Sequence, residues 1–159
     1  MNHRELAENN FLAGYNCAQS VLLAFAEDLG LDGDFALRLS SSFGGGMGRL
    51  REVCGAVSAI LMAAGLVYGY TAPGDDGAKA AHYARVQALA EAFRREHGSI
   101  LCRELLGRAG PESPVPEART AAYYAGRPCA ALVGSAAEIF ETYLAEYPPE
   151  RRKHPSISK

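Results

Sequence analysis

The sequence lacks the short cysteine motifs that most readily identify a redox or metal protein. None of its four cysteines forms a CxxC pair or a CxxCH motif. That absence removes the local signatures of a thioredoxin-type dithiol, a zinc knuckle and a covalently attached c-type haem. No Ser–His–Asp arrangement or paired-carboxylate motif can be read from the spacing either. Redox or metal chemistry would therefore need cysteines that the fold brings together from distant parts of the chain.

The sequence also has little net charge and no long apolar segment. Its formal net charge is -2, and the basic residues form no stripe, which argues against a nucleic-acid partner. No apolar region typical of a signal peptide follows Met1. The longest apolar run, around residues 56–70, holds no charge but is too short and too rich in Gly and Ala for a confident membrane span. The sequence thus predicts a cytoplasmic protein without membrane insertion, in which stable structural disulfides are disfavoured.

No segment shows sustained β alternation, and there is no internal repeat. Apolar residues recur at helical spacing instead, which predicts an all-α, single-domain bundle of five or more helices. Helices are expected at residues 4–13, 17–29, 35–39, 49–67, 78–95, around Cys102, and at 128–147, with 119–125 either a helical turn or part of a linker. The helical domain is expected to cover residues 1–147, followed by a polar tail at 148–159.

The four cysteines share one predicted location, the beginning of a helix. They are Cys17, Cys54, Cys102 and Cys129, of which Cys54 is expected about one turn inside its helix. A helix N-terminus carries partial positive charge, which stabilises a thiolate and lowers the thiol pKa. Arg103 and Arg127, adjacent or close to two of these cysteines, would add to this effect. We therefore expect a thiolate site that binds a metal or reacts with a disulfide; the alternative is that the cysteines pack as small hydrophobes.

A glycine-rich loop precedes Cys54. Its glycines and the one after Cys54 are candidates for close backbone approach to a cofactor; they are Gly44, Gly45, Gly46, Gly48 and Gly55. The loop has no GK[ST] ending and follows no predicted strand, so neither the P-loop nor the dinucleotide-binding fingerprint fits. The simpler interpretation is a tight turn that brings Cys54 close to another part of the backbone.

The order of these motifs resembles a redox-active protein family named for its cysteine pattern, C_GCAxxG_C_C. The matching segments are GYNCAQSV with Cys17, CGAVSA from Cys54 to Ala59, CRELLG with Cys102, and RPCAALVG with Cys129. The resemblance covers roughly residues 11–143, and Ala59 stands where the pattern has its final glycine. It implies a small helical protein with a redox or iron–sulfur role; a related domain occurs in the split-Soret type of cytochrome.

Three hypotheses about function follow from these residues. In the first, the cysteines bind an iron–sulfur cluster, or zinc, for electron transfer or sensing, because four soft thiolates without a nearby histidine suit such groups. In the second, two of the cysteines cycle between dithiol and disulfide without a cofactor. In the third, the cysteines only pack within a non-enzymatic helical module. A redox partner protein is implied by the first, and thin Ala/Gly helix faces are compatible with a homodimer.

Overall fold

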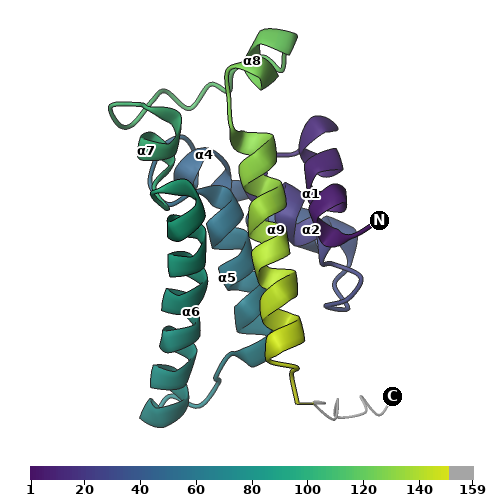
Figure 1. Ribbon diagram of the computed structural model, residues 1–159, viewed down its shortest axis with the longest axis vertical. Helices are drawn as coiled ribbons and strands as arrows, with labels where there is room; N and C mark the ends of the chain where they lie inside the picture. The colour runs from purple at the N-terminus through teal and green to yellow at the C-terminus, as the bar shows by residue number, and fades with distance from the viewer. Residues whose placement is uncertain (151–159) are drawn as a thin grey trace.

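The computed structural model describes residues 1–150 and shows helices, with no β-strand in that part of the chain (Figure 1). The helices are α1 (His3–Leu12), α2 (Cys17–Ala24), α3 (Gly33–Ser40), the 3-10 helix η1 (Ser41–Phe43), α4 (Gly44–Met47), α5 (Gly55–Tyr68), α6 (Asp76–His97), α7 (Cys102–Leu106), α8 (Ala121–Ala125) and α9 (Cys129–Glu146). The predicted all-α fold with five or more helices is confirmed. The described helices include none that is long and apolar enough to cross a bilayer.

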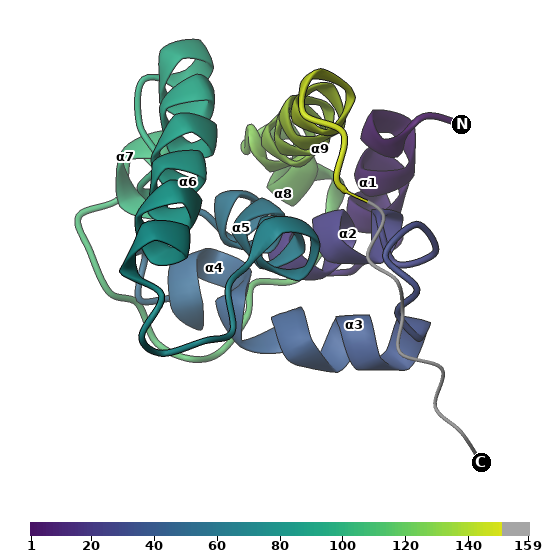
Figure 2. The same cartoon turned by 90° about the horizontal axis from the view of Figure 1, so that it is seen from below.

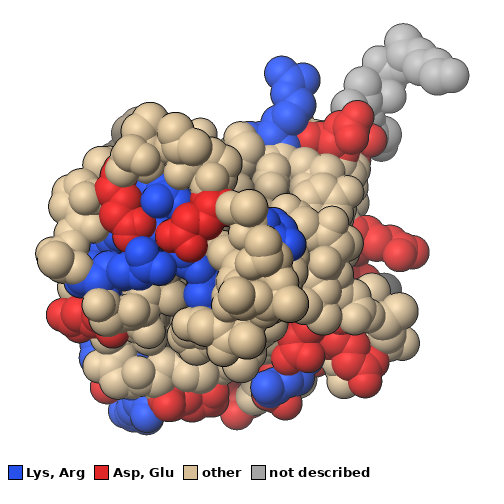
Figure 3. Space-filling view, turned by 90° about the horizontal axis from the view of Figure 1, so that it is seen from above, with Lys and Arg blue, Asp and Glu red and all other residues tan. Residues whose placement is uncertain are grey.

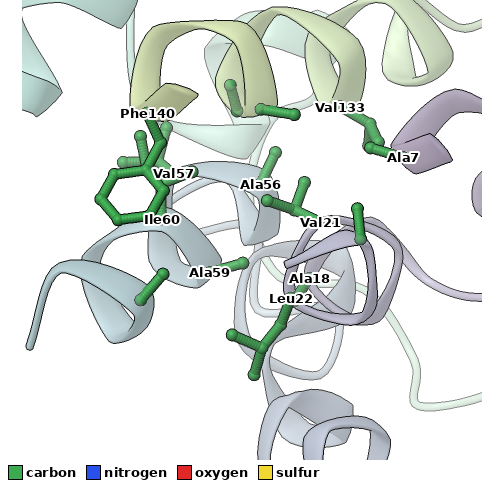
Figure 4. Packing of buried hydrophobic residues seen from close by; sticks show 14 of the residues in the cluster. Ala7, Ala18, Val21, Leu22, Ala56, Val57, Ala59, Ile60, Val133 and Phe140 are labelled. Carbon is green, nitrogen blue, oxygen red and sulfur yellow. The ribbon is translucent and has the colours of Figure 1, made fainter. Parts of the chain in front are cut away.

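Helix α5 occupies the centre of the fold and packs against α2, α6 and α9 (Figures 1 and 2). Its small side chains allow these neighbours to approach closely, and Ala56, Ala59 and Ala63 are fully buried within the chain. Figure 4 shows Phe140 of α9 lying over Val57 and Ile60 of α5. Burying a side chain of this size contributes about 1.5–3 kcal/mol. The alanine face is therefore used inside the chain, and the homodimer stays a prediction.

Two helix boundaries differ from the prediction by five residues or more. The helix expected at 17–29 ends at Ala24, because the chain then turns and Gly30 takes a positive φ of 66°. The helix expected at 49–67 begins only at Gly55, because the residues before it adopt left-handed backbone conformations. Most of the predicted polar tail, from residue 151 onward, lies outside the described residues.

Helix α2 begins where the sequence places it, at Asn16. The Asn16 side chain accepts a hydrogen bond from the Gln19 N–H at 2.9 Å, and the Gln19 side chain accepts one from the Asn16 N–H at 3.2 Å. This capping box satisfies two N–H groups that a helix start leaves unpaired. It also fixes Cys17 as the first residue of α2.

Candidate functional site

All four cysteines line one cavity of about 250 Å³. Each stands at the start of a helix: Cys17, Cys102 and Cys129 are the first residues of α2, α7 and α9, and Cys54 is the residue that precedes α5. The predicted position of Cys54 one turn inside its helix is wrong, because α5 starts later than expected. The four thiols are free. Helix starts far apart in the sequence thus converge on one cavity.

A short backbone pairing positions Cys54 beside Cys102. Val53 and Leu101 form an isolated antiparallel bridge. The Cys54 N–H donates to the Ile100 carbonyl at 2.8 Å, and the Cys102 N–H donates to the Glu52 carbonyl at 2.6 Å. Because these bonds involve the cysteines' own backbone, they hold the backbone of Cys54 and that of Cys102 side by side.

The glycine-rich loop forms a left-handed turn beneath the cavity. Gly45, Gly46 and Gly48 have φ values of 68°, 64° and 63°, and Met47 and Arg49 share this conformation at 67° and 71°. A left-handed conformation costs a non-glycine residue about 1–2 kcal/mol, and strain of this kind persists where surrounding structure enforces it. The loop therefore leads the chain beneath the cavity to the paired segment that positions Cys54.

The predicted glycines have two different locations. Gly44, Gly45, Gly48 and Gly55 line the cavity, and their approach to a cofactor stays a prediction. Gly46 does not, because it is buried against the chain: a Cβ there would lie 2.6 Å from Cβ of Cys102. Its role is therefore to allow close packing beneath the site rather than contact with a ligand.

The prediction of low-pKa thiolates is wrong for three of the cysteines. Burial raises the pKa of Cys17 and raises that of Cys54 well above its usual range; backbone N–H groups at the helix starts offset only part of either rise. Burial and the neighbouring Cys17 also raise the pKa of Cys129 to about 11, although Arg127 acts in the opposite direction. Desolvation outweighs the helix N-terminus here, so without a bound cation these thiols are protonated at neutral pH.

This result predicts a pH profile for alkylation. We expect iodoacetamide to modify Cys129 slowly at neutral pH in metal-free, reduced protein, because the thiolate is the nucleophile and the thiol pKa is about 11. The rate should rise about tenfold per pH unit and level off only near that pKa. Mass spectrometry of the Cys129 peptide measures the alkylation rate, and circular dichroism verifies that the protein stays folded. Denatured protein, whose rate should level off near pH 8.5, is the control; a plateau at that pH in folded protein would contradict the raised pKa.

Arginines form much of the polar lining of the cavity, and most of them were not predicted from the sequence. Arg51 is the most enclosed, with a side chain only 3% exposed. Its Nη1 lies 3.5 Å from the Cys102 sulfur, and its Nη2 donates to Glu112 at 2.9 Å. Arg103, expected to face the thiols, pairs instead with Glu52 at 3.1 Å. Arg51 therefore supplies the positive charge beside Cys102 that the prediction assigned to Arg103.

Two glutamates on the loop between α7 and α8 neutralise only part of this charge. Glu112 accepts hydrogen bonds from Arg49, Arg51 and Arg108 at 2.9–3.0 Å. Glu117 pairs with Arg127 at 2.6 Å. Figure 3 shows basic and acidic side chains gathered in a hollow at this end of the molecule.

The fifth arginine of this group, Arg119, has no carboxylate partner among the described residues. Its guanidinium donates to the carbonyls of Phe11 and Tyr15 and lies over aromatic rings. Five arginines and two glutamates leave an excess of three positive charges here, in a chain whose formal net charge is -2. The cavity is therefore suited to anionic contents.

Three further polar residues have minor places in or near the site. Tyr123 lines the cavity. Glu52 is exposed, and its side chain pairs with Arg103. His82 lies on α6 outside the cavity lining, and burial lowers its pKa.

The four thiols are the potential ligands for a metal or a cluster at this cavity. Within residues 1–150, no three Cys, His, Asp or Glu side chains are placed to hold a single ion. The four thiols instead surround a volume, with positive charge at its edge. A cluster held by several thiolates is both extended and negatively charged, so these residues fit it in donor type and in charge.

The comparisons with known proteins identify one family. One family model, described as "Putative redox-active protein (C_GCAxxG_C_C)", matches residues 15–143, a span that contains all four cysteines. No curated protein and no solved structure was found to match.

Proposed function

The chain belongs to the C_GCAxxG_C_C family of redox-active proteins, and from that premise we propose that its four cysteines bind an iron–sulfur cluster for electron transfer or redox sensing. The observation that carries the proposal is the meeting of four thiols around one cavity with an excess of positive charge. Thiolates are the usual protein ligands of such clusters. A bound cluster would supply one-electron chemistry, with a redox partner protein as the source or acceptor of the electron.

The surrounding residues have separate tasks in this proposal. Backbone N–H groups of Gly45, Ala18 and Gly55 face the Cys17 sulfur, and hydrogen bonds to ligand sulfurs help set a cluster's potential. Arg51 brings a positive charge to the Cys102 sulfur, which offsets the negative charge of the ligands. The small exposure of Cys54 limits the access of water and oxygen. The chain thereby provides ligands, charge balance and shielding.

Replacement of single cysteines tests the proposal. We expect wild-type protein reconstituted anaerobically with iron and sulfide to show broad visible absorption that bleaches with dithionite. The Cys54→Ser and Cys102→Ser variants should lose most of that absorption, because serine is a poor cluster ligand. Assays of bound iron and acid-labile sulfide provide the second measurement.

Ala131→Ser is the matched control, because it adds the same hydroxyl at an exposed position of α9 close to Cys129. This variant should bind as much iron and sulfide as the wild type does. Circular dichroism of the metal-free variants establishes that they fold. A featureless spectrum and no bound iron in folded, reconstituted wild-type protein would exclude the cluster. If both cysteine variants bound as much iron and sulfide as the wild type, the cysteines would have only a packing role.

The contact between Arg51 and Cys102 favours a second candidate, a cofactor-free dithiol–disulfide pair, because a cation beside sulfur stabilises a thiolate. The exposure of Cys54 and Cys102 is only 6% and 8%, which hinders attack by a protein disulfide. A glutathione redox titration of metal-free protein tests this candidate. Formation of one intramolecular disulfide, seen as the loss of two hydrogens by mass spectrometry, would support it.

A further inference from the structure

The cavity lining contains an arginine that has no carboxylate partner within residues 1–150. Arg119 lines the cavity, and its two Nη groups donate to the carbonyls of Phe11 at 3.3 Å and Tyr15 at 3.1 Å. These neutral acceptors orient the guanidinium. Since a guanidinium has five N–H donors, others remain available for a ligand.

Arg127 provides a second guanidinium at the same place. The centres of the Arg119 and Arg127 guanidinium groups lie 4.8 and 4.3 Å from the centroid of the Tyr123 ring, and all three residues line the cavity. Stacking on an aromatic ring restrains a guanidinium without using its N–H donors. Two restrained cations in one cavity are an arrangement suited to binding oxygen anions, which arginine contacts with paired hydrogen bonds.

Glu117 already provides such an anion from within the chain. Its carboxylate pairs with Arg127 at 2.6 Å and with Arg108 at 3.4 Å, and its side chain is 38% exposed. It belongs to the loop between α7 and α8, two residues before Arg119. The Arg127 side chain is only 7% exposed and needs a counter-charge, whereas Glu117 lies at the solvent-accessible side of the pair. An external anion that takes over this counter-charge can therefore displace the Glu117 carboxylate.

A buried donor at the cavity gives independent support. Nε of Arg51 is buried and has no hydrogen-bond partner in the described part of the chain, while the other two nitrogens of that group contact Cys102 and Glu112. Buried donors are nearly always paired in folded proteins. An unpaired N–H on a cavity-lining arginine indicates that an acceptor is missing from this site.

We propose that the cavity binds a small oxyanion, with Arg119 and Arg127 as the main binding cations and Glu117 as the internal carboxylate that the ligand displaces. The inference that this oxyanion is the molecule that meets the redox site rests on the proposed function. Binding of the oxyanion itself needs no cluster. The low-dielectric walls and surplus positive charge concentrate anions at the cavity. The site thereby selects small anionic molecules over neutral ones.

Sulfate is the probe that tests this proposal. Isothermal titration calorimetry of reduced, iron-free protein, with sodium chloride used to keep ionic strength constant, should show saturable binding at one site. Glu117→Gln should tighten binding about fivefold by removing the competing carboxylate. Arg119→Gln should weaken it about tenfold or more by removing a charged donor. Arg94→Gln, which alters an exposed arginine paired with Glu91 on α6, should leave it unchanged.

The Glu117 variant protects the test against misfolding. Arg119 also packs on aromatic rings, so its replacement can disturb the fold, whereas the Glu117 side chain is exposed and a packing role for it predicts no gain in sulfate affinity. Absence of saturable sulfate binding in both wild type and Glu117→Gln overturns the proposal, as does equal affinity of these two proteins. Because the cluster is assayed separately through iron and sulfide, failure of one proposal is distinguishable from failure of the other.

Discussion

Replacing Gly46 with alanine is expected to destabilise the folded chain by about 3–4 kcal/mol. An added Cβ would lie 2.6 Å from Cβ of Cys102, 2.8 Å from the Glu52 nitrogen and 2.9 Å from Cα of Arg51. Backbone atoms among these neighbours cannot rotate away, so the loop must separate from the paired segment that carries Cys102. The left-handed φ of 64° adds a conformational cost for alanine. Urea denaturation followed by circular dichroism measures the loss.

Gly48→Ala is the matched control for this prediction. Gly48 has nearly the same φ, 63°, but nothing lies within 4 Å of an added Cβ. Its replacement should therefore cost only the conformational part, about 1–2 kcal/mol. Equal losses in the two variants would show that the close approach of the loop to Cys102 contributes nothing to stability.

The position of Cys17 and Cys129 at helix starts could be predicted because its signals are local. Asn16 before Cys17 and Pro128 before Cys129 mark helix starts in the sequence itself, and both helices begin there. Four helix starts that each carry a cysteine suggest a shared site once the helices pack together. The sequence therefore located the thiols more reliably than it described their chemistry.

The start of α5 could not be predicted in the same way. Apolar spacing extends the helix back to residue 49, yet Arg49 and Arg51 have φ values of 71° and 58°. Pairing with a segment about fifty residues away enforces this conformation, through bonds such as that from the Arg103 N–H to the Arg51 carbonyl at 3.2 Å. Local propensity contains no information about such a distant partner.

Neither the direction of the thiol pKa shifts nor the arginine network could be predicted from the sequence, and the reasons are related. The direction of a thiol's pKa shift depends on whether burial outweighs the helix N-terminus, and burial of Cys54 is a property of the assembled fold. Arg51 and Glu112 are 61 residues apart in the sequence, so no spacing rule links them. Basic residues that look scattered along the chain are therefore concentrated at one cavity.

The second large effect is expected for Glu112→Gln, which should lower the stability at neutral pH by about 2–4 kcal/mol. Glu112 is the carboxylate that accepts a hydrogen bond from the buried Arg51 at 2.9 Å, and it also holds Arg49 at 3.0 Å. Glutamine keeps the size of the side chain but removes its charge. An enclosed guanidinium then loses its counter-charge, which costs more than losing an exposed ion pair.

The pH dependence of this effect identifies its electrostatic origin. The hydrogen bond from Arg51 holds the pKa of Glu112 below its usual range, so its stabilising contribution is present at neutral pH and is lost as the pH falls below about 4. The stability difference between wild type and Glu112→Gln should therefore shrink in acid. Glu91→Gln, whose arginine partner Arg94 is exposed, should cost less than about 1 kcal/mol. The counter-charge of Arg51 would not stabilise the site if Glu112→Gln lost no more stability than Glu91→Gln does. The same would follow if the loss of stability in Glu112→Gln did not change in acid.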